Sequence, residues 1–269
     1  MKYSEKYGYT PDRDAIGRAI EMIAANMENI ATEQVYKDCF SMMDLTTLKT
    51  DDTPASVTKL VEKVNSFHNI FPEWPYPASI CVFSNFASTV KEARKGDYNI
   101  TVVSACFPSS QSFLEVKLKE VEMAVEQGAD EVDIVLALNA FLAGDYEAAS
   151  DEIRQVRRVI DEVAGKQNRN VHLKVILETG LLKTPENIAD ASFLAMEAGA
   201  DFIKTSTGKK IGFKPAGGIS SAADALCYYS IVSSLLGKEW LNKELFRFGV
   251  SRVANSILSA VEQKTVSYF

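Results

Sequence analysis

The sequence predicts an α/β protein that folds as a (β/α)8 TIM barrel with extra N-terminal helices, and three observations support this. Short β-branched runs alternate with amphipathic stretches from about residue 42 onward, and parallel strands need such crossovers. Eight runs in 269 residues favour a closed barrel over an open doubly wound sheet. The open sheet would also need a glycine-rich turn after its first strand, and residues 42–53 contain no glycine.

Each predicted element follows from a local pattern. The strand-like runs lie at residues 42–48, 78–83, 99–105, 131–136, 172–178, 201–206, 210–215 and 246–250. Amphipathic helices are predicted at 53–67, 112–128, 145–165, 184–199, 220–237 and 251–263. Those that start at Thr53 and Thr184 begin with a cap-like threonine followed by proline.

The N-terminal region precedes the first strand. It contains helical segments at 14–28 and 32–40, which we expect to cap the bottom of the barrel or to pack beside it. No repeat or linker indicates a second domain. We therefore expect a single domain over residues 1–269, with a helical extension at 1–41 and the barrel at 42–269.

One predicted connection is too short. Three residues separate the run that ends at Ser206 from the run that begins at Lys210. Parallel strands need a crossover of roughly a dozen or more residues. Three or four residues reach only about 14 Å, whereas a strand is about 17 Å long. Either one run is not a barrel strand or a segment is missing, and we favour a missing crossover helix between Lys209 and Lys210.

Composition and charge exclude several classes of protein. With 46% hydrophobic and 24% charged residues, the chain has the balance of a globular protein. A net charge of −7 disfavours a nucleic-acid partner. The four cysteines show no C-x-x-C spacing, and two histidines cannot build a His-rich site, so we expect no metal and no cofactor. The polar start and the short apolar stretches predict a soluble, cytoplasmic protein without a membrane partner.

Charged residues inside the predicted strands indicate the chemistry. They include Asp44, Asp133, Lys174, Lys204 and Lys214. A single such lysine could pair with a carboxylate in a polar core layer, but three lysines and Asp133 on four strands favour a functional site. In a barrel this site would lie at the C-terminal ends of the strands.

A lysine cluster of this kind suits Schiff-base chemistry. A lysine beside other cations and shielded from water loses its proton more easily, because the ammonium form is disfavoured. The neutral amine can attack a carbonyl, and the resulting Schiff base acts as an electron sink for carbon–carbon cleavage or formation. A nearby carboxylate can move the protons. Lys204, Lys214 and Asp133 therefore suit a metal-independent aldolase.

Glycine-rich segments predict a phosphate site. Gly stands with Ser or Thr at the ends of three predicted strands, in segments 205–210, 215–220 and 247–252, and the last two segments open helices. Backbone N–H groups at helix N-termini bind anions, and Lys209 could add a charge. In this fold a phosphate site commonly lies after the seventh and eighth strands.

The motifs together resemble those of a known family. MDLTTL (43–48), GADEVDIVL (128–136), LKVILETG (173–180), GADFIKTSTGK (199–209), GFKPAGGI (212–219) and RFG (247–249) resemble the deoxyribose-phosphate aldolase family, which consists of class I aldolases. The likeness runs from about residue 42 to 251, and FIKTSTGK with GFKPAGG is highly specific. It implies a (β/α)8 barrel that cleaves 2-deoxy-D-ribose 5-phosphate reversibly to acetaldehyde and D-glyceraldehyde 3-phosphate through a lysine Schiff base.

The resemblance implies a role for each matching residue. Lys204 would form the Schiff base, Lys214 would favour its neutral amine, and Asp133 would relay protons. Lys174 would act electrostatically or as an orienting group, and Asp44 would lie near the pocket. The family's phosphate contacts fall on Gly208, Lys209, Gly217, Gly218, Gly249 and Ser251. The partners would be small phosphorylated sugars and aldehydes, and the family is often a homodimer.

The sequence also departs from the family pattern. The family's helix between TSTGK and GFKPAGG is absent, Ser220 stands where a basic residue is common, and Arg252 replaces a serine that contacts phosphate. Cys81 matches a position near the pocket but could equally be a buried filler. Tyr268 is an incomplete match to a C-terminal tyrosine implicated in proton transfer, and a frayed tail is the simpler interpretation.

Two rival functions remain open at the level of sequence. Another Schiff-base or phosphosugar barrel, with a transaldolase-like or epimerase-like activity, would turn over keto-sugar phosphates instead of deoxyribose 5-phosphate. A non-catalytic phosphosugar-binding barrel would bind its ligand without turnover.

Overall fold

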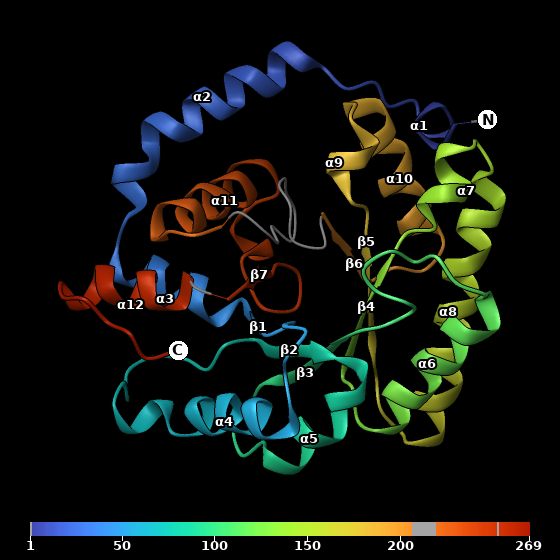
Figure 1. Ribbon diagram of the computed structural model, residues 1–269. Coiled ribbons are helices and arrows are strands. Elements are labelled where there is room, and N and C mark those ends of the chain that lie inside the picture. Colours follow the sequence, from blue (N-terminus) through green and yellow to red (C-terminus); the bar gives the residue numbers. More distant parts are fainter. Residues whose placement is uncertain (1, 206–218, 252) are drawn as a thin grey trace.

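The computed structural model describes residues 2–205, 219–251 and 253–269. Within them seven strands form one parallel sheet in the order β6-β5-β4-β3-β2-β1-β7 (Figure 1). The strands are β1 (Met43–Thr46), β2 (Ser79–Phe83), β3 (Asn99–Val103), β4 (Glu131–Val135), β5 (His172–Ile176), β6 (Phe202–Lys204) and β7 (Phe248–Val250). Each lies inside a predicted run, so seven of the eight predicted strands are confirmed. The eighth, at 210–215, and the short link at Lys209 and Lys210 lie outside the described residues.

Helices connect the strands and cover the outer face of the sheet (Figure 1). The longer ones are α4 (Pro54–Asn65), α6 (Leu114–Glu126), α8 (Tyr146–Lys166), α10 (Pro185–Glu197), α11 (Ala222–Leu235) and α12 (Val253–Glu262), all of them predicted. The sequence did not predict α5 (Ala87–Ala93), α7 (Leu138–Leu142) or α9 (Thr179–Leu182). These are too short to show a helical period.

Helix starts follow their local signals. The Thr53 side chain accepts a hydrogen bond from the backbone N–H of Ser56, and Thr184 caps α10 in the same way through Asn187. A proline fills the first turn of both helices. Because such caps satisfy donors that have no partner within the helix, they fix where each crossover begins.

The sheet curls until distant strands face each other. The Nζ of Lys174 in β5 lies 2.8 Å from Asp44 Oδ2 in β1, although three strands separate them in the sheet. The ring centroid of Phe202, in β6 at one edge, lies 5.6 Å from the guanidinium carbon of Arg247, which directly precedes β7 at the other edge. The architecture is therefore of the α/β TIM-barrel type.

Three helices precede β1, and the predicted helical segments at 14–28 and 32–40 correspond to the second and third of them. The three helices are α1 (Tyr3–Lys6), α2 (Arg13–Ile30) and α3 (Glu33–Ser41). Helix α3 buries Phe40, whose ring stacks on Phe67 in the connection that leads to β2, so α3 closes the N-terminal end of the sheet. Helix α2 lies outside the sheet along α11, and α1 packs against α10 (Figure 1).

The C-terminal tail is packed, so the interpretation of a frayed tail is wrong. The Tyr268 hydroxyl donates to the Lys63 carbonyl at 2.7 Å, and the rings of Tyr268 and Phe269 lie 5.5 and 5.4 Å from Phe67. The Asn255 side-chain oxygen accepts the backbone N–H groups of both tail residues, at 2.9 and 3.0 Å. Lys63 and Phe67 precede β2, so Tyr268 lies at the N-terminal end of the sheet.

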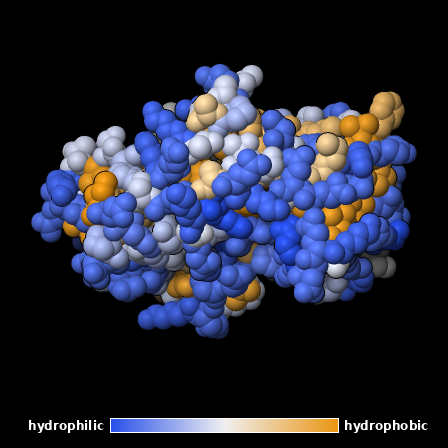
Figure 2. Space-filling view, turned by 90° about the horizontal axis from the view of Figure 1, so that it is seen from below, coloured by the Kyte–Doolittle hydropathy of each residue, from blue (hydrophilic) through white to orange (hydrophobic). Residues whose placement is uncertain are grey.

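The outer surface is mostly hydrophilic. Figure 2 shows separate apolar patches on the face seen from below. Phe113, Val116 and Met123, at and along α6, are among the exposed apolar side chains. Within the described part of the chain, no helix has both the length and the apolar character to cross a membrane.

We expect the tail to stabilise the fold. Tyr268→Ala should lower the free energy of unfolding by about 2 kcal/mol, because it removes a half-buried ring from an aromatic cluster. Tyr268→Phe keeps the ring, loses the hydrogen bond to Lys63 and should cost about 1 kcal/mol. Urea denaturation measures both values. An alanine variant as stable as the original protein would contradict this role.

Candidate active site

Four predicted site residues meet inside the curled sheet. Asp44, Asp133, Lys174 and Lys204 come from β1, β4, β5 and β6, and all are buried. Side chains alternate along a strand, and one set points inward when a sheet curls. Lys174 lies in mid-strand and is 0% exposed, whereas Lys204 ends β6 and is 4% exposed. The cluster thus extends to the C-terminal ends of the strands, where barrels carry their sites.

Asp133 faces two lysines. Its Oδ2 lies 2.7 Å from the Lys204 Nζ, and its Oδ1 lies 3.7 Å from the Lys174 Nζ. Lys174 also forms ion pairs with Asp44, at 2.8 Å, and with Glu131. Three carboxylates therefore surround Lys174, whereas in the described residues Lys204 is paired with Asp133 alone. The two amines differ in their surroundings although they share one partner.

Glu131 and Arg247 complete the cluster, and the sequence did not single them out. Arg247 is 0% exposed, and its Nη1 lies 2.8 Å from Asp44 Oδ1 and 3.1 Å from Glu131 Oε2. Its Nη2 donates to Glu131 Oε1 at 2.7 Å. One signal for Glu131 was available, because it stands two residues before Asp133 and so points to the same side of β4. For Arg247 the signal was its place beside β7 in the RFG motif.

Hydroxyl groups join the carboxylates across β2 and β3. The Ser79 hydroxyl donates to Asp44 Oδ1 at 2.7 Å, and the Thr101 hydroxyl lies 2.7 Å from both Ser79 and Glu131. Strand register aligns these groups, because Asp44 pairs with Ser79 and Thr101 pairs with Glu131. The polar layer therefore continues from β1 to β5 without a break.

Among the described residues, acidic and basic groups are equal in number in this cluster. Three carboxylates (Asp44, Glu131, Asp133) meet three basic side chains (Lys174, Lys204, Arg247). Burial alone would raise the pKa of Glu131, but Lys174 and Arg247 outweigh it and lower that pKa to about 2. Burial opposes the charge on Arg247, whereas Asp44 and Glu131 raise its pKa. Buried ions are costly unless they are paired, so each group depends on the others to stay charged.

The structure describes two of the six residues that are predicted to bind phosphate. Gly249 lies in β7 opposite Asp44 in register, and the exposed Ser251 follows that strand, two residues before α12 begins. Cys81 is buried on β2, in register with Thr46. Five predicted site residues, Lys214, Gly208, Lys209, Gly217 and Gly218, lie outside the described residues.

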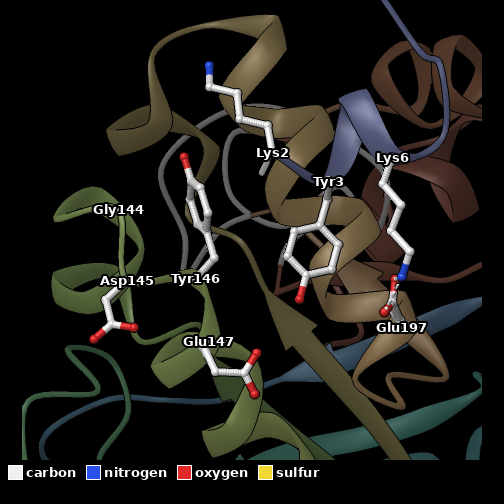
Figure 3. Close-up of a pocket in the computed structure, with 8 residues that line it drawn as sticks. All are labelled: Lys2, Tyr3, Lys6, Gly144, Asp145, Tyr146, Glu147 and Glu197. Carbon is white, nitrogen blue, oxygen red and sulfur yellow. Dashed lines mark hydrogen bonds and ion pairs between the residues drawn. The ribbon is translucent and has the colours of Figure 1, made fainter.

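A separate cavity of about 380 Å³ lies beside α1. It is lined by Lys2, Tyr3, Lys6, Gly144, Asp145, Tyr146, Glu147 and Glu197 (Figure 3). None of these residues belongs to the ionic cluster. The Lys6 Nζ lies 2.6 Å from Glu197 Oε1, and both side chains are exposed, so solvent screens the pair. The buried cluster is therefore the candidate active site.

Comparisons with known proteins show what this chain is similar to. A family model described as DeoC/LacD family aldolase matches residues 39–225. The chain is 39% identical to deoxyribose-phosphate aldolase from Homo sapiens, over 83% of this chain and 78% of that protein. It is 36% identical to deoxyribose-phosphate aldolase from Bos taurus, over 82% and 78%.

Two further details of the comparisons concern the fold. The tetrameric deoxyribose phosphate aldolase from Aeropyrum pernix aligns with 94% of this chain and 100% of its own, with a TM-score of 0.64 at 22% identity, which is a likeness of fold. The match to the human protein extends over 261 positions but takes in only 83% of these 269 residues. Some positions of the human protein therefore have no counterpart in this chain.

Glu131→Gln should change how stability depends on pH. The pKa of Glu131 is about 2 in the folded protein, below its ordinary value of 4.5. Its contribution to stability is therefore present above pH 4.5 and is lost as the pH falls towards 2. Glutamine cannot ionise, so the variant should be less stable by about 3 kcal/mol at pH 7 and should show a flatter dependence below pH 4.5.

Urea unfolding from pH 7 to pH 2 measures both effects. A variant whose stability curve runs parallel to that of the original protein across this range would show that Glu131 is not held as a carboxylate by its neighbours.

Proposed function

This chain belongs to the DeoC/LacD family of aldolases and is a lyase, and we propose that it cleaves 2-deoxy-D-ribose 5-phosphate reversibly. The products would be acetaldehyde and D-glyceraldehyde 3-phosphate, and the reaction would run through a Schiff base on Lys204. The single observation that carries this proposal is the buried contact of 2.7 Å between the Lys204 amine and the Asp133 carboxylate.

Lys204 suits the nucleophile better than Lys174 does. A nucleophilic amine has to lose its proton and reach the substrate carbonyl. Lys174 is fully buried, and its amine is enclosed by ion pairs with Asp44, Glu131 and Asp133, which leave no room for a substrate carbonyl. Lys204 ends its strand at the rim where substrates enter barrels of this type.

The chemistry needs an electron sink and a proton carrier. The neutral Lys204 amine would add to the C1 aldehyde, and loss of water would give an iminium ion. Deprotonation of the C3 hydroxyl then breaks the C2–C3 bond, releases glyceraldehyde 3-phosphate and passes the electron pair to the iminium as an enamine. Protonation at C2 and hydrolysis release acetaldehyde. Asp133 is the carboxylate placed to move these protons, directly or through water.

The remaining roles follow from position. Lys214, on the proposed eighth strand, would bring a second cation to Lys204 and favour its neutral amine. Gly249 lies in β7 and Ser251 follows that strand just before α12, and an anion site of backbone N–H groups is typical at such a junction. Together with Gly208, Lys209, Gly217 and Gly218 they would hold the substrate phosphate.

The proposed nucleophile can be trapped chemically. Borohydride with acetaldehyde should reduce a Schiff base and add a stable two-carbon adduct, which peptide mass mapping should locate on Lys204. Lys204→Met should form no adduct and should cleave deoxyribose 5-phosphate at least about a thousandfold more slowly.

Lys117→Met is a matched control, because Lys117 is also buried but pairs with Glu152 between α6 and α8. It should keep the adduct on Lys204. An adduct on Lys174, or none in the original protein, would contradict the proposal. Turnover of keto-sugar phosphates without cleavage of deoxyribose 5-phosphate would favour a different Schiff-base barrel.

We also propose that a crossover helix and an eighth strand close the barrel between β6 and β7. The gap in the match to the human relative supports this. So does the length of the link between the two predicted strands, because its three residues are too few for a crossover between parallel strands. The intact protein should then have a mass above 29.6 kDa by more than about 1 kDa, since a crossover takes roughly a dozen or more residues. Mass spectrometry of the intact protein measures this. A value near 29.6 kDa would contradict the missing helix.

A further inference from the structure

Arg247 occupies an unusual place for an arginine. It is 0% exposed, and its guanidinium contacts Asp44 and Glu131, on β1 and β4. Its Nε also donates to the Lys243 carbonyl, and its planar end lies over the Phe202 ring. These contacts fix the guanidinium from several directions. A buried arginine held in this way carries a charge that no accessible pH removes, because its guanidinium does not deprotonate in proteins.

A chain of contacts leads from Arg247 to the proposed nucleophile. Arg247 shares both Asp44 and Glu131 with Lys174. Lys174 in turn lies 3.7 Å from Asp133, whose other oxygen lies 2.7 Å from Lys204. Lys174 also lies over the Phe202 ring, 5.6 Å from its centroid, as Arg247 does. Arg247 and Lys174 therefore both form ion pairs with Asp44 and Glu131.

We propose that Arg247 is a positioning residue of the active site. It neutralises part of the charge of Asp44 and Glu131, the two carboxylates that it shares with Lys174, and it thereby sets the electrostatic potential at Lys204. The inference rests on the proposed function, because it concerns the amine that would form the Schiff base. It adds a residue that touches neither the substrate nor the reacting atoms.

The physical reason is the balance of charge. With Arg247 present, three cations offset three carboxylates in the described cluster. Without it the cluster loses one positive charge, and the more negative potential favours the ammonium form of Lys204. Among the residues that the structure describes, the charged groups that face this amine through the cluster are Asp133 and Lys174, with Asp44 and Glu131 behind them.

The test compares Arg247→Met, which removes the charge, with Arg247→Lys, which keeps it. The readouts are kcat/KM for cleavage of deoxyribose 5-phosphate from pH 5 to 9 and the pH dependence of borohydride trapping on Lys204. For Arg247→Met the acid side of both profiles should move up by about one pH unit, as expected when a buried cluster loses one unit of positive charge. Its kcat near neutral pH should fall at least about tenfold.

Arg247→Lys should keep the profile of the original protein with a smaller loss in kcat, because lysine retains the charge but lacks the two-pronged contact with Glu131. Lys117→Met is the control for the loss of a buried cation elsewhere. It should lower the melting temperature without moving either profile.

The outcomes separate the two proposals. A folded Arg247→Met protein whose profiles coincide with those of the original protein, at any level of activity, would overturn the positioning role. If Arg247→Met does not fold, Arg247→Lys decides: an unchanged profile supports the inference, and a shifted one overturns it. If the original protein forms no adduct on Lys204 at any pH, the proposed function fails, and this inference fails with it.

Discussion

The cost of burying charge is the constraint on which this structure depends. In the part of the chain that the structure describes, six acidic or basic side chains lie inside the curled sheet, and a charge is tolerated there only beside partners of opposite sign. The partners come from β1, β4, β5 and β6 and from Arg247 beside β7, so they can meet only if the sheet curls. Fold and site therefore depend on each other: the curl brings the charges together, and their pairing joins strands that share no backbone hydrogen bonds.

Lys174 and Lys204 occupy different positions in this cluster, and we propose different roles for them. Lys174 lies in mid-strand among three carboxylates, whereas Lys204 ends its strand with Asp133 beside it. Asp133 links them, so a change in the charge of one amine is felt by the other. In the proposed reaction such a shared carboxylate would move protons next to the amine that becomes covalently bound to the substrate. The packed C-terminal tail lies at the opposite end of the strands, with Tyr268 in an aromatic cluster.

Much of this arrangement could be predicted from the sequence, because it follows local rules. Seven strands were evident as β-branched runs between helices, and Lys174 and Lys204 were evident because lysine is rare inside strands. Helices such as α5 were missed because one or two turns show no period. Arg247 was missed because an arginine next to a strand looks like a surface residue, and only the meeting of distant strands buries it. Tyr268 was misjudged for the same reason, since its contacts with Lys63 and Phe67 are remote in sequence.

The central claim is that one amine of this cluster is the nucleophile and that the remaining charges stay in place around it. A crystal structure of the protein after borohydride reduction with substrate tests this most directly. We expect continuous density from the Lys204 Nζ to the substrate carbon, Asp133 within hydrogen-bonding distance of the adduct, and Lys174 still paired with Asp44 and Glu131. An adduct on Lys174, or an Asp133 carboxylate turned away from Lys204, would contradict it.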